Sequence, residues 1–156
     1  MKQTTLCFLV RKGEVLLAMK KRGFGVGKFN GVGGKVESGE SVVQATIREA
    51  EEEIGVRIKQ ADAKQKAHLT FFFEGKPEWN QECHVFVVSK WASDPVETDE
   101  MRPEWFQVQN LPFDGMWIDD PLWLPRVLRG ESLKASFVFD QEGKKLLSSE
   151  VEGNVS

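Results

Sequence analysis

The chain has 156 residues, of which 40% are hydrophobic and 29% are charged, and its formal net charge at pH 7 is −3. This length and composition fit one globular domain with one hydrophobic core. A net negative charge argues against a protein that coats a nucleic acid polymer, since that function needs a basic face. A small phosphorylated ligand, held by a few local cations and a metal ion, remains compatible with it.

No membrane or export signal is visible in the sequence. The longest apolar stretch near the N-terminus, residues 6–10, is too short for a signal-peptide core or a membrane span. Cys7 and Cys83 do not have the spacing of a metal site, and nothing indicates an oxidising compartment. We therefore expect a cytoplasmic protein with no membrane partner, and we expect it to be a monomer.

The N-terminal part predicts a hairpin followed by a long loop. Residues 4–10 and 14–19 are rich in β-branched and aliphatic side chains, with Lys12-Gly13 between them. Residues 19–34 contain several lysines and six glycines, a composition that a regular element would not tolerate. This segment is expected to be a glycine-rich basic loop.

A helix is predicted over residues 41–54. Ser41 and Gln44 have the spacing of a capping box, and Gly55 can terminate the last turn. Apolar residues recur with helical spacing, which predicts one buried stripe. The stripe consists of Val43, Ile47, Ala50 and Ile54.

The next segments read as strands. Residues 67–73 and 83–91 have strand composition and are joined by the polar segment 74–82. Residues 104–108 form a short strand after an acidic loop at 97–100.

The C-terminal part is expected to contain one helix and a closing hairpin. The helix runs from residue 119 to about residue 128, although Pro125 would disturb it. The hairpin comprises residues 133–140 and 144–147, and residues 149–156 are expected to be loose. Strands outnumber helices and occur in mixed order, which predicts an α/β sandwich.

The most informative stretch is the acidic part of the first helix. Glu49, Glu52 and Glu53 fall within an arc of roughly 100°, apart from the apolar stripe. Such a carboxylate face suits a hard divalent cation such as Mg²⁺, although an acidic helix face is more often simply solvated. The glycine-rich basic loop just before the helix favours the functional interpretation, since backbone N–H groups and lysines can hold phosphate oxygens. Arg48 can also form an ion pair with Glu52.

The spacing around this helix resembles the signature of the Nudix hydrolases. Every fixed glycine and polar position is present, and Ala50 is a soft departure where the family has a bulkier aliphatic residue. The matching positions are Gly34, Glu40, Arg48-Glu49, Glu52-Glu53 and Gly55-Val56. A pattern of this length with so many fixed positions is very specific.

The likeness extends to the animal-type oxidised purine nucleoside triphosphate diphosphatases and covers roughly residues 4–140. It is carried by the segments 19–25, 30–36, 95–103 and 112–120. It implies a single Nudix domain over residues 1–156, with a core at about 4–148. The implied fold is a Nudix α/β/α sandwich built on a mixed β-sheet.

The resemblance also implies residue roles. Catalysis would fall to Glu49, Glu52 and Glu53, with Glu53 or Glu52 as the general base. The same glutamates would hold Mg²⁺, or Mn²⁺ as a substitute, together with Gly33 and Glu100. Substrate would be bound by Thr5, Lys20, Phe24, Asn30, Gly34, Lys35, Phe72, Trp117, Asp119 and Asp120. The alignment shifts by about one residue between Phe72 and Cys83.

The chemistry of the residues agrees with a purine site. Trp117 offers a flat face, Asn30 carries a donor and an acceptor, and the carboxyls of Asp119 and Asp120 accept, or donate if protonated. A core aromatic and a helix N-cap are the structural alternatives for Trp117 and Asp119.

The function that the resemblance implies is hydrolysis of oxidised purine nucleoside triphosphates, such as 8-oxo-dGTP and 2-hydroxy-dATP, to the monophosphate and pyrophosphate. One alternative is a Nudix pyrophosphatase acting on another nucleoside diphosphate derivative, such as a nucleotide sugar, a dinucleotide polyphosphate or a capped nucleotide. Another is a Nudix-fold binding module without turnover.

Overall fold

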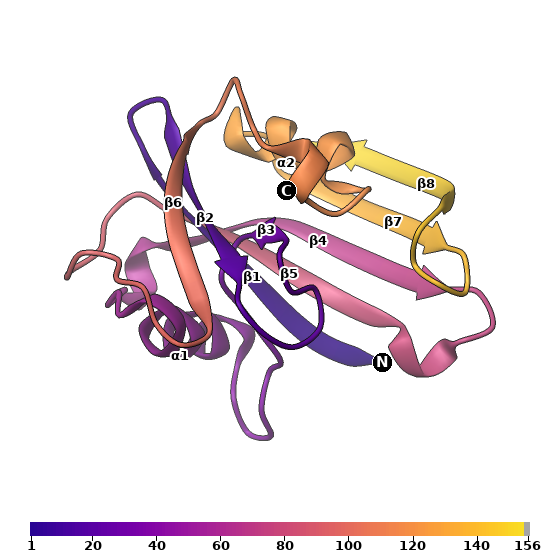
Figure 1. Ribbon diagram of the computed structural model, residues 1–156, viewed down its shortest axis with the longest axis horizontal. Coiled ribbons are helices and arrows are strands. Elements are labelled where there is room, and N and C mark those ends of the chain that lie inside the picture. The colour runs from indigo at the N-terminus through magenta and orange to yellow at the C-terminus, as the bar shows by residue number, and fades with distance from the viewer. Residues whose placement is uncertain (155–156) are drawn as a thin grey trace.

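The computed structural model describes residues 1–154 as a mixed sheet with helices on its two faces (Figure 1). The strands are β1 (Lys2–Arg11), β2 (Glu14–Lys20), β3 (Phe29–Asn30), β4 (Ala63–Phe73), β5 (Gln81–Val88), β6 (Met101–Gln107), β7 (Leu133–Phe139) and β8 (Leu146–Gly153). The helices are α1 (Val42–Ile54) and α2 (Asp120–Leu128), with short 3-10 turns at Gln60–Asp62, Pro77–Trp79 and Phe113–Gly115. Neither helix is long and apolar enough to cross a membrane.

The strand order is β3-β2-β1-β5-β4-β7-β8, and β6 pairs with β2. The pairs β1–β5 and β4–β7 are parallel, and the other pairs are antiparallel. The predicted β1–β2 hairpin is confirmed, but the two strands pair only beside the turn, at Val10–Val15 and Arg11–Glu14. Beyond that point the loop after β3 pairs with the edge of β1 that β2 leaves free. The backbone N–H groups of Thr5 and Cys7 donate hydrogen bonds to the carbonyl oxygens of Gly34 and Val32.

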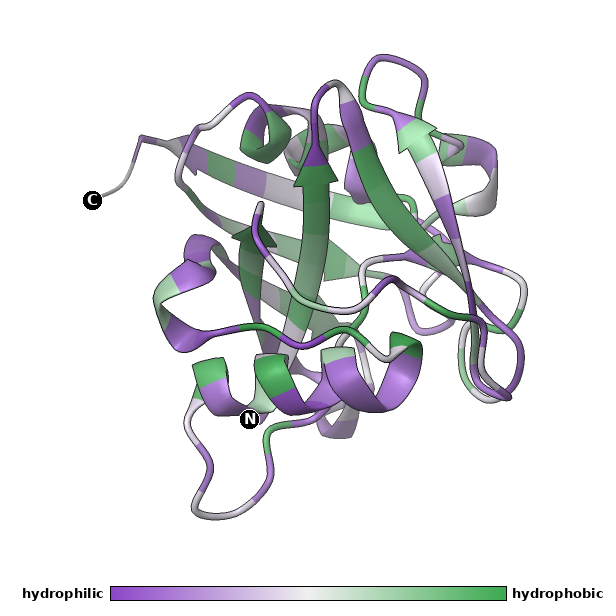
Figure 2. Cartoon of the chain, turned by 90° about the vertical axis from the view of Figure 1, so that its left-hand side faces the viewer, coloured by the Kyte–Doolittle hydropathy of each residue, from purple (hydrophilic) through white to green (hydrophobic). Residues whose placement is uncertain are grey.

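Two hydrophobic cores lie on opposite faces of the sheet, which gives the α/β/α sandwich expected from the sequence. Helix α2 contributes Trp123 and Leu124 to the first core. Helix α1 contributes Ala50 and Ile54 to the second. The central strands are hydrophobic in Figure 2, whereas α1 alternates between hydrophobic and hydrophilic segments, as expected of a helix with one packed face.

Helix α1 has the predicted boundaries. Ser41 and Gln44 form both hydrogen bonds of a capping box, and Gly55 ends the helix in the left-handed conformation at φ 71°. The predicted stripe is correct at Ala50 and Ile54, but Val43 is only half-buried. The stripe missed the buried residues Ala45, Thr46 and Glu53.

Two other expectations were wrong. The tail is not loose over its described part, because β8 pairs with β7 as far as Gly153; residues 155–156 lie outside the described residues. Most side chains of β8 are exposed, and besides Leu146 and Val151, which pack against the first core, backbone pairing at the sheet edge holds the strand. The basic loop contains the short strand β3. By contrast, the predicted end of helix α2 is confirmed: the helix continues through Pro125 to Leu128.

Candidate active site

A cavity of about 290 Å³ lies where β1 and β2 diverge, between the glycine-rich loop, β4 and the start of α2. Nearly all residues expected to bind substrate line it. They are Thr5, Lys20, Phe24, Asn30, Gly34, Lys35, Trp117, Asp119 and Asp120, together with Gly33.

Phe72 is the exception, because it does not line this cavity. Phe71 and Phe73 line the cavity, whereas Phe72 does not and is 37% exposed. Successive side chains of a strand point to opposite faces, so a shift of one residue in an alignment exchanges the two faces. The one-residue shift of the alignment between Phe72 and Cys83 agrees with such an exchange.

Two buried carboxyl groups stand at the inner end of the cavity. Asp119 and Asp120 are 4% and 2% exposed. Asp119 precedes α2 but does not cap it; its carboxylate accepts a hydrogen bond from the indole N–H of Trp123 at 2.8 Å. The carboxylate of Asp120 accepts from the backbone N–H of Trp117 at 3.1 Å. Burial raises the pKa of both carboxyls, and the charge of Asp119 raises the pKa of Asp120 further.

Asn30 faces the same cavity with a defined orientation. Its side-chain oxygen accepts a hydrogen bond from the backbone N–H of Gly31 at 2.8 Å. The amide NH₂ is therefore the part that Asn30 can offer to a ligand, and the side chain acts mainly as a donor.

Aromatic rings form the mouth of the cavity. Phe24 is 69% exposed and stacks on Trp117 with 5.3 Å between ring centroids. Trp79 approaches Phe24 at 6.4 Å, and the ammonium group of Lys28 lies 5.1 Å from the Trp117 ring centre. Gly25 packs so closely against Trp117 that an added Cβ atom would lie 3.0 Å from the ring, and its φ of 84° also favours glycine. The sequence interpretation did not single out Lys28 or Trp79.

The glycine-rich loop joins the cavity to the glutamates of α1. The backbone N–H of Gly33 donates to the Glu53 carboxylate at 2.8 Å. A Cβ atom at Gly34 would lie 2.8–2.9 Å from the carboxylate atoms of Glu49. Gly33 and Gly34 also line the cavity. Only this glycine segment therefore separates a ligand that contacts them from the carboxyl groups of Glu49 and Glu53.

The three glutamates do not converge as closely as the helical arc predicted. Among residues 1–154 they do not form a group with all ligand oxygens within 4.8 Å of one another. The three have different partners: the Arg48 guanidinium bonds Glu49 at 2.7 Å and Glu52 at 3.2 Å, whereas Glu53 accepts from the backbone N–H of Gly33. The Arg48–Glu52 pair was expected, but Glu40, at 2.8 Å from the guanidinium, makes the arginine the centre of a network.

The carboxyl groups nevertheless lie close enough to influence one another's ionisation. Burial raises the pKa of Glu53 to about 8, and the nearby charges of Glu49 and Glu100 act in the same direction. Burial also raises the pKa of Glu49. Lys20 partly offsets the repulsion at Glu53. A partly buried carboxylate group of this kind fits a divalent cation, since the incoming positive charge would stabilise the ionised form.

The family model of the NUDIX domain matches residues 2–127. The chain belongs to the Nudix family. It is 44% identical over 139 residues to the oxidized purine nucleoside triphosphate hydrolase of Danio rerio, with 88% of this chain and 86% of that protein covered. The protein of the same name from Mus musculus is 40% identical, again over 139 residues, with the same shares covered.

Solved structures agree with this membership. The crystal structure of a mutator MutT protein from Bacillus halodurans superposes with a TM-score of 0.82 and 25% identity, covering 97% of this chain and 98% of that one. The chain is thus a Nudix hydrolase with the Nudix sandwich fold, and, as in other Nudix hydrolases, its chemistry uses a divalent metal.

Proposed function

We propose that this Nudix hydrolase cleaves oxidised purine nucleoside triphosphates, of the 8-oxo-dGTP and 2-hydroxy-dATP type, to the monophosphate and pyrophosphate. The observation that carries the proposal is one cavity lined by two chemically distinct sets of groups. The buried Asp119–Asp120 pair, which we assign to the base end, is one set; Gly33 and Gly34, which contact Glu53 and Glu49 and which we assign to the phosphate end, are the other. The names of the fish and mouse relatives support the same substrate class.

At the phosphate end we assign the ligand roles to Glu49, Glu52 and Glu53, with Gly33 and Glu100 completing the site. Mg²⁺ bound there, or Mn²⁺ in its place, would neutralise phosphate charge and lower the pKa of bound water. The N–H of Gly33 orients the Glu53 carboxylate. Glu53 or Glu52 takes the proton of the attacking water.

Positive groups at this end hold the triphosphate. Lys20 lines the cavity and stands near Glu53, where it can contact the phosphates without replacing the metal. Lys35 and the backbone of Gly34 lie further along the same wall. Arg48 orients Glu49 and Glu52, two of the residues that would hold the cation, through hydrogen bonds of 2.7 and 3.2 Å.

At the base end the purine edge meets the two aspartates. Two adjacent buried carboxyls do not ionise equally, because burial raises both pKa values and the charge of the first to ionise raises the pKa of the second. The carboxyl that keeps its proton donates a hydrogen bond, while the other accepts and Asn30 donates. A pair that can offer both a donor and an acceptor suits oxidised guanine and oxidised adenine, whose edges present different donor patterns.

The test is pyrophosphate release with Mg²⁺ across 8-oxo-dGTP, 2-hydroxy-dATP and the unmodified purine and pyrimidine triphosphates. The specificity constant should be highest for the oxidised purines. Preference for nucleotide sugars, dinucleotide polyphosphates or capped nucleotides would replace this substrate class by the second one. Binding without turnover would show a Nudix-fold binding module. A monomeric state, a cytoplasmic location and a single domain over residues 1–156 stay predictions.

A further inference from the structure

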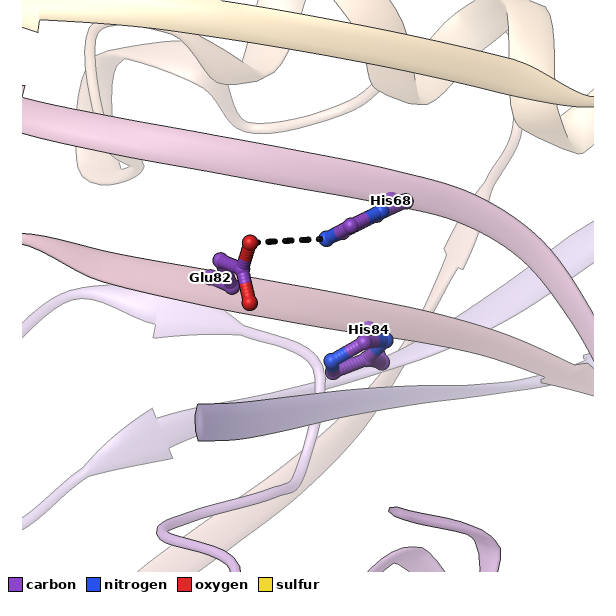
Figure 3. Close-up of side chains that lie close together, drawn as sticks. All are labelled: His68, Glu82 and His84. Atoms are coloured by element: carbon purple, nitrogen blue, oxygen red, sulfur yellow. Dashed lines mark ion pairs between the residues drawn. The ribbon is translucent and has the colours of Figure 1, made fainter. Parts of the chain in front are cut away.

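A second cluster of metal-ligating side chains lies away from the glutamates of α1. His68 on β4 and Glu82 and His84 on β5 each offer one ligand atom, and these atoms lie within 4.8 Å of one another. Figure 3 shows the three side chains grouped together, with His68 directed at Glu82. The chain has two histidines, and both are in this cluster.

The sheet register explains why three distant positions meet. His68 stands directly opposite His84 in the antiparallel β4–β5 pair, and Glu82 lies two residues before His84 on β5. Residues two apart on a strand and their cross-strand partners share one face of the sheet. Cys83, between the two β5 ligands, lines the nucleotide cavity, so the cluster occupies the opposite face of the same strands.

One of the possible ligand atoms in the cluster has no hydrogen-bond partner among the described residues. This atom, the Nε2 of His68, is buried and stands 3.7 Å from Glu82 Oε1. Such an unpaired buried nitrogen costs free energy unless a partner arrives. The two imidazoles stack with 4.8 Å between ring centroids and an angle of 13°, which aligns their edges.

Neighbouring glutamines hold the remaining atoms. Gln3 donates through its Nε2 to Glu82 Oε2, and its Oε1 lies 2.7 Å from His84 Nε2. The Gln3 amide therefore bridges the two β5 ligands, where a cation would compete with it. The amide nitrogen of Gln65 lies 3.1 Å from His84 Nδ1 and donates to it. When His84 Nε2 binds a metal and Nδ1 carries the proton, a 180° turn of the Gln65 amide would present its oxygen as the acceptor. Metal-bound imidazoles usually have a partner of this kind on the second nitrogen.

We propose that His68, Glu82 and His84 form a binding site for a Zn²⁺-class transition metal ion, separate from the catalytic cation and independent of the proposed substrate. Two imidazoles and one carboxylate suit zinc, whereas Mg²⁺ prefers an all-oxygen set. Tetrahedral zinc needs ligand atoms about 3.4 Å apart, so small side-chain rotations close the site. A bound ion links β4 to β5 behind the wall of the cavity.

The experiment uses the untagged protein with Mg²⁺ in large excess, so that the catalytic glutamates are not available to zinc. Zn²⁺ is titrated by calorimetry, and the imidazole signals of the two histidines are followed by NMR. We expect one Zn²⁺ per chain, shifts of both imidazoles, and a Tm rise of roughly 5 °C or more at a hundredfold excess over Kd. Co²⁺ in place of Zn²⁺ should give the visible absorption of a low-coordinate ion.

Three variants remove ligands: His68→Gln, Glu82→Gln and His84→Gln. Each should weaken Zn²⁺ binding at least tenfold. Thr70→Ala is the matched control, since Thr70 stands opposite Glu82 on the same face and should leave binding unchanged. Both histidines are part-buried, so His68→Gln provides a second test if His84→Gln does not fold.

Zinc binding of unchanged affinity in His68→Gln would overturn the proposal. So would unshifted imidazole signals at one equivalent of Zn²⁺, or displacement of the ion by millimolar Mg²⁺. Because His68 has no place in the nucleotide cavity, His68→Gln should keep Mg²⁺-dependent hydrolysis, and failure of the proposed substrate class would leave the zinc result unaffected.

Discussion

The backbone N–H of Gly33 donates a 2.8 Å hydrogen bond to the Glu53 carboxylate and thereby fixes the glycine-rich loop against helix α1. Glu53 is 4% exposed, so its charge is far less hydrated than that of the solvent-facing Glu51 on the same helix. The contact places a wall of the cavity directly beside a catalytic carboxyl group.

Replacing Glu53 by Gln is expected to lower kcat by about 100-fold or more, because an amide neither balances metal charge nor accepts a proton. The fold should persist, since the amide oxygen can still accept from Gly33. Steady-state kinetics at saturating Mg²⁺ and circular dichroism provide the measurement. Glu51→Gln, on the exposed side of α1, is the control and should retain activity. Near-normal turnover in folded Glu53→Gln would contradict the assignment.

Metal removal should abolish hydrolysis reversibly. Excess chelator is expected to stop pyrophosphate release, and Mg²⁺ or Mn²⁺ should restore it, because the catalytic ligands are oxygens. Glu49→Gln and Glu52→Gln should raise the Mg²⁺ concentration needed for half-maximal rate. Full activity in a metal-free preparation would exclude the proposed mechanism.

The Asp119–Asp120 pair should determine the choice of purine. Asp120→Asn removes the exchangeable proton of the carboxyl and leaves one fixed amide arrangement. We expect the ratio of kcat/KM for 8-oxo-dGTP and 2-hydroxy-dATP to change, while the Mg²⁺ dependence stays the same. An unchanged ratio would refute the base-reading model but leave the hydrolase assignment intact.

The same pair should make stability depend on pH. Burial raises both pKa values in the folded state, so the neutral carboxyls favour folding at pH below about 4, and this contribution is lost as the pH rises. Urea unfolding of the metal-free protein at pH 5 and pH 8 measures the loss. In Asp120→Asn the loss should be smaller by roughly 1–3 kcal/mol. Equal losses in both proteins would count against the buried pair as its source.

Two adjacent phenylalanines test the register of β4. Phe71→Ala should raise KM several-fold, because Phe71 lines the cavity, and should also destabilise the fold, because its ring stacks on Phe137. Phe72→Ala should leave KM close to the wild-type value, since Phe72 is outside the cavity. Comparable KM values in the two folded variants would place the substrate elsewhere.

Much of this protein follows from local sequence. The capping box at Ser41, the terminating Gly55 and the order of the glutamates depend on neighbours within a few residues, so the boundaries of α1 and the Nudix spacing were correct. The strands β1 and β2 and the helix α2 were also found near their true positions.

Only the tertiary structure decided which faces and partners these elements have. The register of β4 put Phe71 rather than Phe72 at the cavity, and pairing with β7 ordered a strand most of whose side chains are exposed. The β4–β5 register likewise brought His68 to His84. Sheet pairing joins residues far apart in the chain, and a shift of one residue reverses a strand's faces, so local patterns leave these outcomes open.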